Sequence, residues 1–582
     1  MKKLNLLTIT LLAGSLFSSC EKALDPKVDS DYSNEYVWTL PDYAQGILIN
    51  AYANVPNQFN SYGGDFLDVA TDNAVTNNYS SDLFELGSGS LNANKNPIGA
   101  WGNAYVQFRN IHLFLENGLT DKITYNVLDP AADAAVKNRL KGEALFLRAW
   151  WGFQLLQQYG GKATNGLALG YPIVKSTQEA LKSDVTRNTY EQCVQQILSD
   201  CDAAALLLPK VYAGNDAIVG TTSLGRANKQ VAAALKSRVA LYAASPANRD
   251  NSVTQLNGPG NFTVLDQTAY TDQWKRAVTL SQEAITLIGN FSSLKTSDFT
   301  SPTIPNEVIW ARYTNNSSLE NLNYPVAHYG NAYTGPSQNL VNSFPAKNGF
   351  PITDARSLYS ANNPYTNRDP RLELNVYRNG SVLDIKPIET FVGGRDSKEA
   401  YPNNTRTGYY LRKWLTDKDF LLDPQNPLSD YHYNVLLRKT ELFLNLAEAS
   451  NEAYGPTVVA PGSTQSAVTI IKNIRTAAGI TSNLYVDEVA AQGKDAFRRL
   501  IQNERRLELA FENHRYFDLR RWLLPLSESV NGVQIVKSTA GVLQFSEFEV
   551  EKRKFNDIKY YYHPLPFVEI AKSPGLINNL GW

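Results

Sequence analysis

The chain has 582 residues, which is long enough to bury a large core. It carries 55 basic and 56 acidic residues, and this near-neutral balance argues against a nucleic-acid partner. Cys193 and Cys201 lie about 12 Å apart along one predicted helix, too far for a disulfide. We therefore interpret both thiols as core residues and expect neither a disulfide framework nor a zinc site.

The first twenty residues predict where the protein is located. Lys2 and Lys3 precede an apolar run over residues 4–16, and small residues then lead to Cys20. The run is well short of the ~20 residues that span a bilayer, so it favours a cleaved export signal. We predict a bacterial lipoprotein signal over residues 1–19 and lipid attachment at Cys20. The alternative is an ordinary secretory signal followed by an incidental cysteine.

Helical periodicity dominates two blocks of the chain. Thr189 begins the clearest helix, where Gln192 completes a capping box and Pro209 ends the apolar repeat. Other helices of the first block are predicted over residues 103–117, 136–159, 228–245 and 271–288. A second block is predicted over residues 435–454, 465–478 and 494–511. Short links and one apolar stripe per helix indicate a mainly α fold of stacked antiparallel pairs that resemble tetratricopeptide repeats.

Between the two blocks, residues 291–434 lose helical periodicity and hold 12 of the 32 tyrosines. Residues 307–313 predict a strand, and residues 335–337 and 368–370 predict turns. A second loop-rich region covers residues 54–96. Irregular segments held by a rigid frame commonly carry binding sites, so we expect a loop and short-strand insertion to bind the ligand.

The C-terminal part of the chain carries a family resemblance. Residues 504–522 read Glu-Arg-Arg-Leu-Glu-Leu-Ala-Phe-Glu-Asn-His-Arg-Tyr-Phe-Asp-Leu-Arg-Arg-Trp. This segment resembles the C-terminal signature of the SusD/RagB family, the nutrient-binding outer-membrane lipoproteins of the Bacteroidetes. Further segments resemble the family in the same order, namely residues 142–150, 159–161, 171–174, 367–371, 437–449, 564–566 and 581–582.

The resemblance implies one SusD-like domain over residues 20–582, with a helical frame at about 40–290 and 435–524 and a ligand-binding insertion at about 291–434. It implies four tetratricopeptide-like helix pairs, a lipid anchor in the outer membrane facing the cell exterior, and no catalysis or cofactor. It also implies a partner, a SusC-like TonB-dependent transporter that the lipoprotein covers as a lid. Members of the family bind oligosaccharides in most cases and peptides in some.

Charged residues within apolar stripes are interpreted as ion pairs. Glu504 lies among apolar residues on one helical face, where an unpaired carboxylate would cost several kcal/mol. We expect a nearby arginine to neutralise it, with Arg515, Arg520 or Arg371 as candidates. A catalytic acid is the alternative for Glu504. Glu143 and Arg148 are interpreted in the same way, as structural charges.

Signals for catalysis or metal binding are weak. The five histidines lack metal-ligand spacing: His112, His328, His432, His514 and His563. Asp65, Asp68 and Asp72 could be general acids or calcium ligands, but the asparagines around them are more typical of a hydrogen-bonded loop. We expect no metal site. A surface glycoside hydrolase and a helical-repeat scaffold remain as alternatives to a binding protein.

Sugars present apolar C–H faces to aromatic rings and hydroxyls to Asn, Asp and Arg side chains. Loop residues of these types are our candidates for ligand contact: Asp72, Asn73, Tyr79, Tyr324, Tyr329, Asn331 and Tyr333. A peptide would be satisfied by much the same set. We interpret Trp101 and Trp310 as structural residues. The expected function is capture of an oligosaccharide at the cell surface and its delivery to the transporter.

Overall fold

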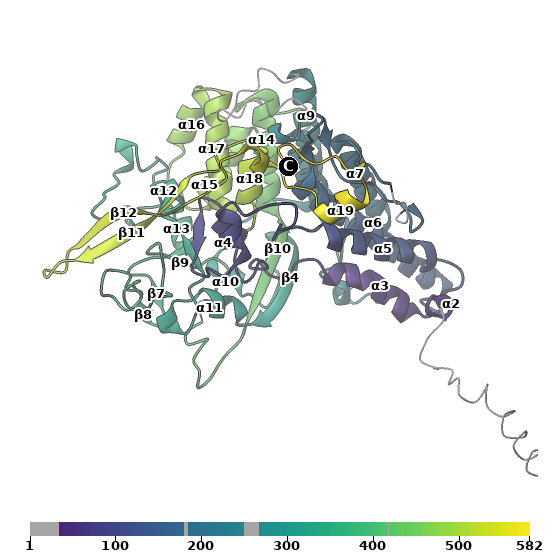
Figure 1. The fold of residues 1–582 in the computed structure, drawn as a ribbon, viewed down its shortest axis with the longest axis horizontal. Coiled ribbons are helices and arrows are strands. Elements are labelled where there is room, and N and C mark those ends of the chain that lie inside the picture. The colour runs from purple at the N-terminus through teal and green to yellow at the C-terminus, as the bar shows by residue number, and fades with distance from the viewer. Residues whose placement is uncertain (1–33, 180–183, 250–266, 417) are drawn as a thin grey trace, which may run out of the picture.

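The computed structural model describes residues 34–179, 184–249, 267–416 and 418–582 (Figure 1). The predicted signal over residues 1–19 and the predicted lipid site at Cys20 lie outside the described residues. Among the described helices, none combines the length and the apolar character that a bilayer crossing requires.

Helices that pack in chain order form the frame of the molecule, and this confirms the mainly α fold of antiparallel, tetratricopeptide-like pairs. The first block comprises α3 (Pro41–Ala53), α5 (Trp101–Asn117), α6 (Pro130–Tyr159), α7 (Tyr190–Leu207), α8 (Lys229–Ala244) and α9 (Gln267–Ile288). The second block comprises α14 (Lys439–Tyr454), α15 (Ala467–Ala477), α16 (Leu484–Ala491), α17 (Lys494–Glu508) and α18 (Arg515–Arg521). Helix α14 packs against α8 and α9, so the two blocks share one helical layer (Figure 1).

Helix boundaries follow local capping. The predicted capping box at α7 is present, with the Thr189 hydroxyl accepting from the Gln192 N–H and the Gln192 side chain accepting from the Thr189 N–H. Helix α6 begins at Pro130, earlier than predicted, because the Asp129 carboxylate accepts the first free N–H groups of the helix.

A long two-stranded ribbon marks where the chain leaves and re-enters the helical frame. Strand β4 (Val308–Asn316) pairs antiparallel with β10 (Asp430–Arg438), which runs directly into α14. The predicted strand at residues 307–313 is thus confirmed. The predicted helix over residues 435–454 is wrong at its start, because residues 435–438 complete this ribbon instead of the first helical turn.

A second pairing joins the two loop-rich regions. Strand β1 (Ala74–Thr76) pairs antiparallel with β5 (Thr334–Pro336), although the two strands are far apart in the chain. The predicted turn at residues 335–337 is therefore wrong. Residues 334–336 extend along β1, and Ser337 caps the short helix α12 (Gln338–Ser343).

The other elements are short, apart from one hairpin that we did not predict. Strands β11 (Ser529–Lys537) and β12 (Leu543–Lys552) form an antiparallel ribbon that projects at the left of Figure 1. Further strand pairs are β2 (Gly161–Lys162) with β3 (Ala168–Leu169), β6 (Val376–Tyr377) with β9 (Tyr410–Leu411), and β7 (Val382–Leu383) with β8 (Lys386–Pro387). Short helices are α2 (Asn34–Val37), α4 (Asp82–Gly87), α10 (Thr296–Phe299), α11 (Ser318–Asn323), α13 (Arg371–Asn375) and α19 (Phe567–Lys572).

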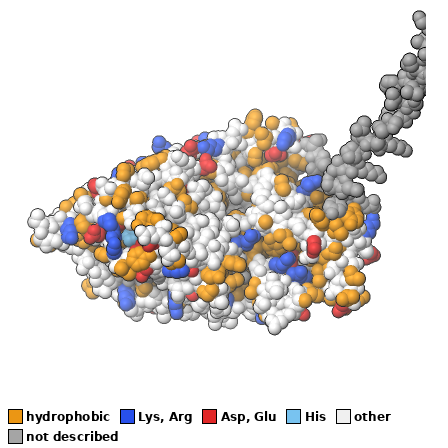
Figure 2. Space-filling view, turned by 90° about the horizontal axis from the view of Figure 1, so that it is seen from below, with side chains coloured by type: hydrophobic (Ala, Val, Ile, Leu, Met, Phe, Trp, Pro, Cys, Tyr) orange, Lys and Arg blue, Asp and Glu red, His pale blue; other side chains and the backbone are white. Residues whose placement is uncertain are grey.

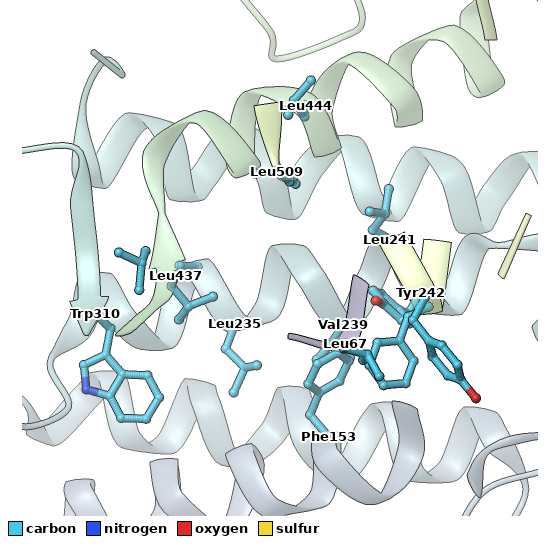
Figure 3. Packing of buried hydrophobic residues seen from close by; sticks show 14 of the residues in the cluster. Leu67, Phe153, Leu235, Val239, Leu241, Tyr242, Trp310, Leu437, Leu444 and Leu509 are labelled. Carbon is cyan, nitrogen blue, oxygen red and sulfur yellow. The ribbon is translucent and has the colours of Figure 1, made fainter. Parts of the chain in front are cut away.

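Helices and ribbon share one hydrophobic core, part of which is seen in Figure 3. Trp310 of β4 is buried, donates from its indole N–H to the Gly225 carbonyl, and meets the ring of Trp150 edge-on at 4.8 Å. Trp101 is also buried and meets Tyr159 edge-on. Both tryptophans are structural, as predicted. Cys193 and Cys201 are free and buried, which confirms their assignment to the core.

Candidate functional site

The most charged part of the C-terminal signature is buried and paired. Glu504 on α17 is fully buried, and its carboxylate lies 2.6 Å from Arg371 and 3.3 Å from Arg475. The predicted ion pair is present with Arg371 as the partner. The expectation that Arg515 fills this role is wrong, because Arg515 binds another carboxylate. A buried, doubly paired Glu504 is not placed to protonate a substrate.

The same network connects the helical block to the insertion. Arg438, at the end of β10, contacts Glu307, Glu508 and Glu512 at 2.8 to 3.2 Å. Lys413 of the insertion contacts Glu512 at 2.8 Å. Although burial opposes the shift, Arg438 and Arg371 lower the pKa of Glu508 to about 2. These charges therefore hold α17 against the two ends of the insertion.

Three of the predicted ligand contacts are buried, and the structure corrects their role. Asp72 accepts two hydrogen bonds from Arg515 at 2.9 Å and also pairs with Arg506. Burial alone would raise the pKa of Asp72, but the two arginines lower it well below its usual range. Asp72 is thus a structural ion-pair residue, since both carboxylate oxygens are engaged by the protein.

Asn73 and Tyr324 are corrected in the same way. Asn73 is fully buried, donates to Asp68 and accepts from Arg506. The Tyr324 ring is buried, and its hydroxyl donates to the Thr416 carbonyl. Neither side chain reaches the surface in this structure, because tertiary packing has closed over the loops that carry them.

Asp65 and Asp68, the other two acidic candidates of the first loop region, are also buried. The Asp65 carboxylate accepts from the Thr76 hydroxyl, and burial raises the pKa of Asp65 to about 6. Asp68 accepts from Asn73 and from the Phe511 N–H. Within the described ranges, no group of three or more His, Cys, Asp or Glu side chains is arranged to hold a metal ion. The geometry fits a hydrogen-bonded loop.

The paired interpretation of Glu143 and Arg148 holds as well. Glu143 is fully buried and contacts Arg226 at 2.9 Å, while Arg148 contacts Asp200 at 2.6 Å. Each is a contact between neighbouring parts of the helical frame, and each is satisfied within the protein.

The exposed candidates lie on two loops that the β1–β5 pairing brings together. Tyr79 and Tyr329 are 62% and 60% exposed, and Asn331 is also exposed. Tyr333 is half-buried, and its carbonyl accepts from the Asn77 N–H at 2.8 Å. The Arg406 guanidinium covers the Tyr79 ring at 5.1 Å. These four candidates therefore stay available for ligand contact on neighbouring loops.

A single carboxylate links three loops that carry exposed apolar side chains. Asp384 accepts from the Phe420 N–H at 2.6 Å and lies 2.7 Å from His328 Nδ1. The other ring nitrogen of His328 lies 3.1 Å from Arg395 Nη2, so a neutral ring with its proton on Nδ1 satisfies both contacts. Although burial opposes the shift, hydrogen bonds from His328 and the Phe420 N–H lower the pKa of Asp384. We call segments 326–333, 382–387 and 418–420 the three-loop cluster.

The three-loop cluster has an unusual backbone. Five of its residues, none of them glycine, have left-handed φ angles between 51° and 63°: Tyr329, Ala332, Asp384, Ile385 and Phe420. Such a conformation costs on the order of 1 kcal/mol or more per residue and persists only where the surroundings enforce it. The hydrogen bonds of Asp384 provide that constraint. Strained, exposed side chains of this kind gather at binding sites.

The cluster adds exposed residues that the sequence reasoning missed. Ile385 is 66% exposed and Phe420 is 47% exposed. Ile385 follows Asp384 in the chain, and the Phe420 N–H donates to the Asp384 carboxylate. Figure 2 views the side on which β7, β8 and α11 lie in Figure 1, and hydrophobic side chains there form separate patches between polar ones. Each is an isolated apolar residue in a loop, and no periodicity in the sequence marks such a residue as exposed.

Chemically, this surface offers flat and aliphatic groups beside hydrogen-bonding groups. The rings of Tyr329 and Phe420 can stack on the C–H face of a sugar or on an apolar peptide side chain. The Tyr329 hydroxyl can donate and accept, and Asn331, whose amide nitrogen donates to Asn321, offers its carbonyl oxygen as an acceptor. The arrangement suits binding, since no pair of free carboxylates accompanies it among the described residues of the cluster.

Comparison with known proteins identifies the family. A family model described as "SusD family" matches residues 306–582, and one described as "Starch-binding associating with outer membrane" matches residues 22–241. A relative named SusD-like protein P25, from Formosa agariphila, is 22% identical over 606 residues, covering 100% of this chain and 98% of the relative.

Solved structures share the fold. A SusD-like protein from Bacteroides fragilis has a TM-score of 0.72 at 22% identity, covering 94% of this chain and 99% of that one. A SusD-like carbohydrate-binding protein from the same species has a TM-score of 0.68 at 20% identity, covering 93% and 99%. The two family models together cover most of the sequence, and the chain therefore belongs to the SusD family.

Proposed function

We propose that the protein captures an oligosaccharide on the three-loop cluster and delivers it to a SusC-like TonB-dependent transporter in the outer membrane. The observation that carries the binding site is the link through Asp384, which fixes exposed Tyr329 and Phe420 side chains on strained backbones. Family membership and the similar fold of the SusD-like carbohydrate-binding protein from Bacteroides fragilis support a glycan as the ligand.

The proposed location rests on the sequence and on the family description. A lipid on Cys20 would tether the domain to the membrane, since each buried methylene contributes roughly 0.8 kcal/mol and two or more chains give stable anchoring. The description of the matching N-terminal family model supports an association with the outer membrane. Exposure of the domain to the cell exterior is part of the same proposal.

A peptide ligand is the second candidate, since tyrosine rings and asparagine amides also suit peptides. A surface hydrolase is less favoured, because it would need two carboxylates about 5 to 10 Å apart across a cleft. Asp65, Asp68 and Asp72, the candidate acids of the first loop region, are instead buried and bonded within the protein. A scaffold that binds protein on its helices would leave the three-loop cluster unused.

A glycan and peptide array tests the proposal with the purified protein and two variants. The double variant Tyr329→Ala with Phe420→Ala removes both exposed rings, and Tyr43→Ala removes an equally exposed ring on α3. Each lost stacking contact is worth about 1 kcal/mol, so the double variant should bind its glycan at least tenfold more weakly. The Tyr43 variant should bind as the unmodified protein does.

Three results would contradict the proposal. Unchanged affinity in the double variant removes the three-loop cluster from consideration. Release of reducing ends from a bound glycan would indicate a hydrolase. Binding to peptides with no binding to any glycan on the array would favour the second candidate, a peptide ligand.

A further inference from the structure

A separate cavity lies between the C-terminal helices and the insertion. Its volume is about 340 Å³, and it lies between helices α15 to α17 and the segment 342–353. Figure 1 places α16 and α17 at the top of the molecule, whereas β7 and β8 of the three-loop cluster lie at the bottom. This volume is at the lower end of the range for small-molecule sites, which is room for one small ligand.

The lining of this cavity is positively charged. Arg475 and Arg499 contribute to its wall, and no Asp or Glu side chain does. Arg475 is almost fully buried, and its Nε–H has no acceptor in the described structure. Its Nη1 lies 3.3 Å from Glu504, which Arg371 also contacts at 2.6 Å, so the charge of Arg475 is matched within the protein. The wall therefore presents one unmatched N–H donor, from Arg475.

A glycine fixes the base of the cavity. The Gly349 carbonyl accepts from Arg475 Nη2 at 2.5 Å. A Cβ at this position would lie 2.5 Å from the Ser482 carbonyl oxygen and 3.0 Å from Arg475 Nη2, and the φ angle is +88°. Only glycine allows this approach, so the guanidinium of Arg475 is held in place by the fold.

Tyr485 and Arg499 lie at the more open part of the wall. The Tyr485 ring meets the Phe350 ring edge-on at 5.8 Å. Burial raises the pKa of Tyr485. The charges of Arg475 and Arg499 oppose this shift and those of Asp354 and Glu488 add to it, so charges of both signs act on this hydroxyl. Arg499 is exposed and has no carboxylate within 4 Å among the described residues, whereas its neighbour Arg498 pairs with Glu452.

Neutral groups complete the lining. Asn503 donates its amide to the Ser343 carbonyl, so its side-chain carbonyl oxygen can accept from a ligand. Asn342 donates to Glu547 and accepts from Gln338, so both ends of its amide are engaged within the protein. Ile352, Val489 and Leu500 supply apolar wall. The combination of arginine, amide, hydroxyl and aliphatic groups is suited to a small ligand that has a carboxylate, several hydroxyls and an apolar ring face.

We propose that this cavity is a second binding site, for a sugar acid of the size of one hexuronic acid, with its carboxylate beside Arg499 and Arg475. A planar carboxylate matches the fork of donors that a guanidinium presents. The hydroxyls of the ring would be bound by Tyr485 and Asn503. The inference concerns a site apart from the three-loop cluster and does not rest on the proposed function.

Calorimetric titration of the purified full-length protein with D-glucuronate, D-glucose and inorganic sulfate tests the site. Glucuronate should bind saturably at one equivalent, and glucose should give no binding at the same concentrations. Arg499→Gln should weaken glucuronate binding about tenfold, because a hydrogen bond to a charged group is lost. Arg356→Gln is the matched control, since Arg356 is exposed nearby but does not line the cavity.

Four outcomes would overturn the proposal: no binding of glucuronate into the millimolar range, equal binding of glucose, unchanged binding in the Arg499 variant, or sulfate binding as well as glucuronate. The last outcome would indicate a general anion site with no preference for a sugar acid. The double variant at Tyr329 and Phe420 should keep its glucuronate binding, so failure of the cavity and failure of the three-loop cluster are distinguishable.

Discussion

The C-terminal signature and the three-loop cluster differ in almost every physical respect. Arg438, Glu504 and Glu508 of the signature region are buried, and each is bound to partners within the protein. Tyr329 and Phe420 of the cluster are exposed, and their backbones are strained. The polar groups of the first region stabilise the fold, whereas the side chains of the second region stay exposed to a ligand. Residues that reveal the family are therefore distinct from residues that we propose bind the cargo.

The largest effect should come from breaking the buried network. Arg438→Met removes the cation that faces Glu307, Glu508 and Glu512 and leaves carboxylates buried without it. The loss of one partner of a buried ion pair typically costs about 3 to 5 kcal/mol of unfolding free energy. Chemical denaturation should show this loss.

Arg356→Met is the matched control for that comparison. Arg356 pairs with Asp354 and Glu488 at the surface, where the solvent screens the charges. Its unfolding curve should overlay that of the unmodified protein. Equal destabilisation by the two substitutions would contradict a special structural role for the buried network.

A pH-dependent stability should come from Asp65. Burial raises its pKa to about 6, whereas an unfolded aspartate titrates near 3.9, so the folded state binds more protons between these values. Stability contributed by the neutral carboxyl is therefore present at low pH and is lost as pH rises through 6. Asp65→Asn should be about 2 kcal/mol more stable than the unmodified protein at pH 7.5 and should show little difference at pH 4.

Thermal unfolding at a series of pH values measures this difference. A stability gain of Asp65→Asn that does not change between pH 4 and pH 7.5 would mean that the carboxyl does not titrate in this range. Asp419→Asn, at an exposed position, should show no such trend.

The smallest of the three effects should come from loosening the three-loop cluster. Asp384→Asn keeps an oxygen for the Phe420 N–H but places an N–H group against His328 Nδ1. The proton on His328 Nδ1 would then have to move to Nε2, which faces Arg395. We expect faster hydrogen exchange at the Phe420 amide and glycan affinity reduced about threefold, since hydrogen-bond losses are near 1 kcal/mol. Unchanged exchange would show that Asp384 does not order the loop.

The fold could be predicted wherever local pattern and capping agree. Helix α7 follows its capping box, and the burial of Glu504 follows its place in an apolar stripe. The helix predicted over residues 435–454 starts too early, because residues 435–438 suit a helix or a strand equally well. Pairing with β4 makes these residues a strand, and β4 is distant from them in the sequence.

The candidate site was predicted only in part, for a similar reason. Tyr79 and Tyr329 were found by residue type in loops, and both are exposed. Asp72 and Tyr324 are of the same types but are buried, because their partners Arg515 and Thr416 come from distant segments. Phe420 was missed because an isolated aromatic residue in a loop has no periodicity that marks its exposure.

A crystal structure of the protein with an oligosaccharide that it binds is the most direct test of the proposed division between fold and site. We expect sugar rings stacked on Tyr329 and Phe420, with the arginines and carboxylates of the C-terminal signature unchanged. A saccharide bound at the Arg438 and Glu508 network, or on the helices of the frame, would contradict this expectation.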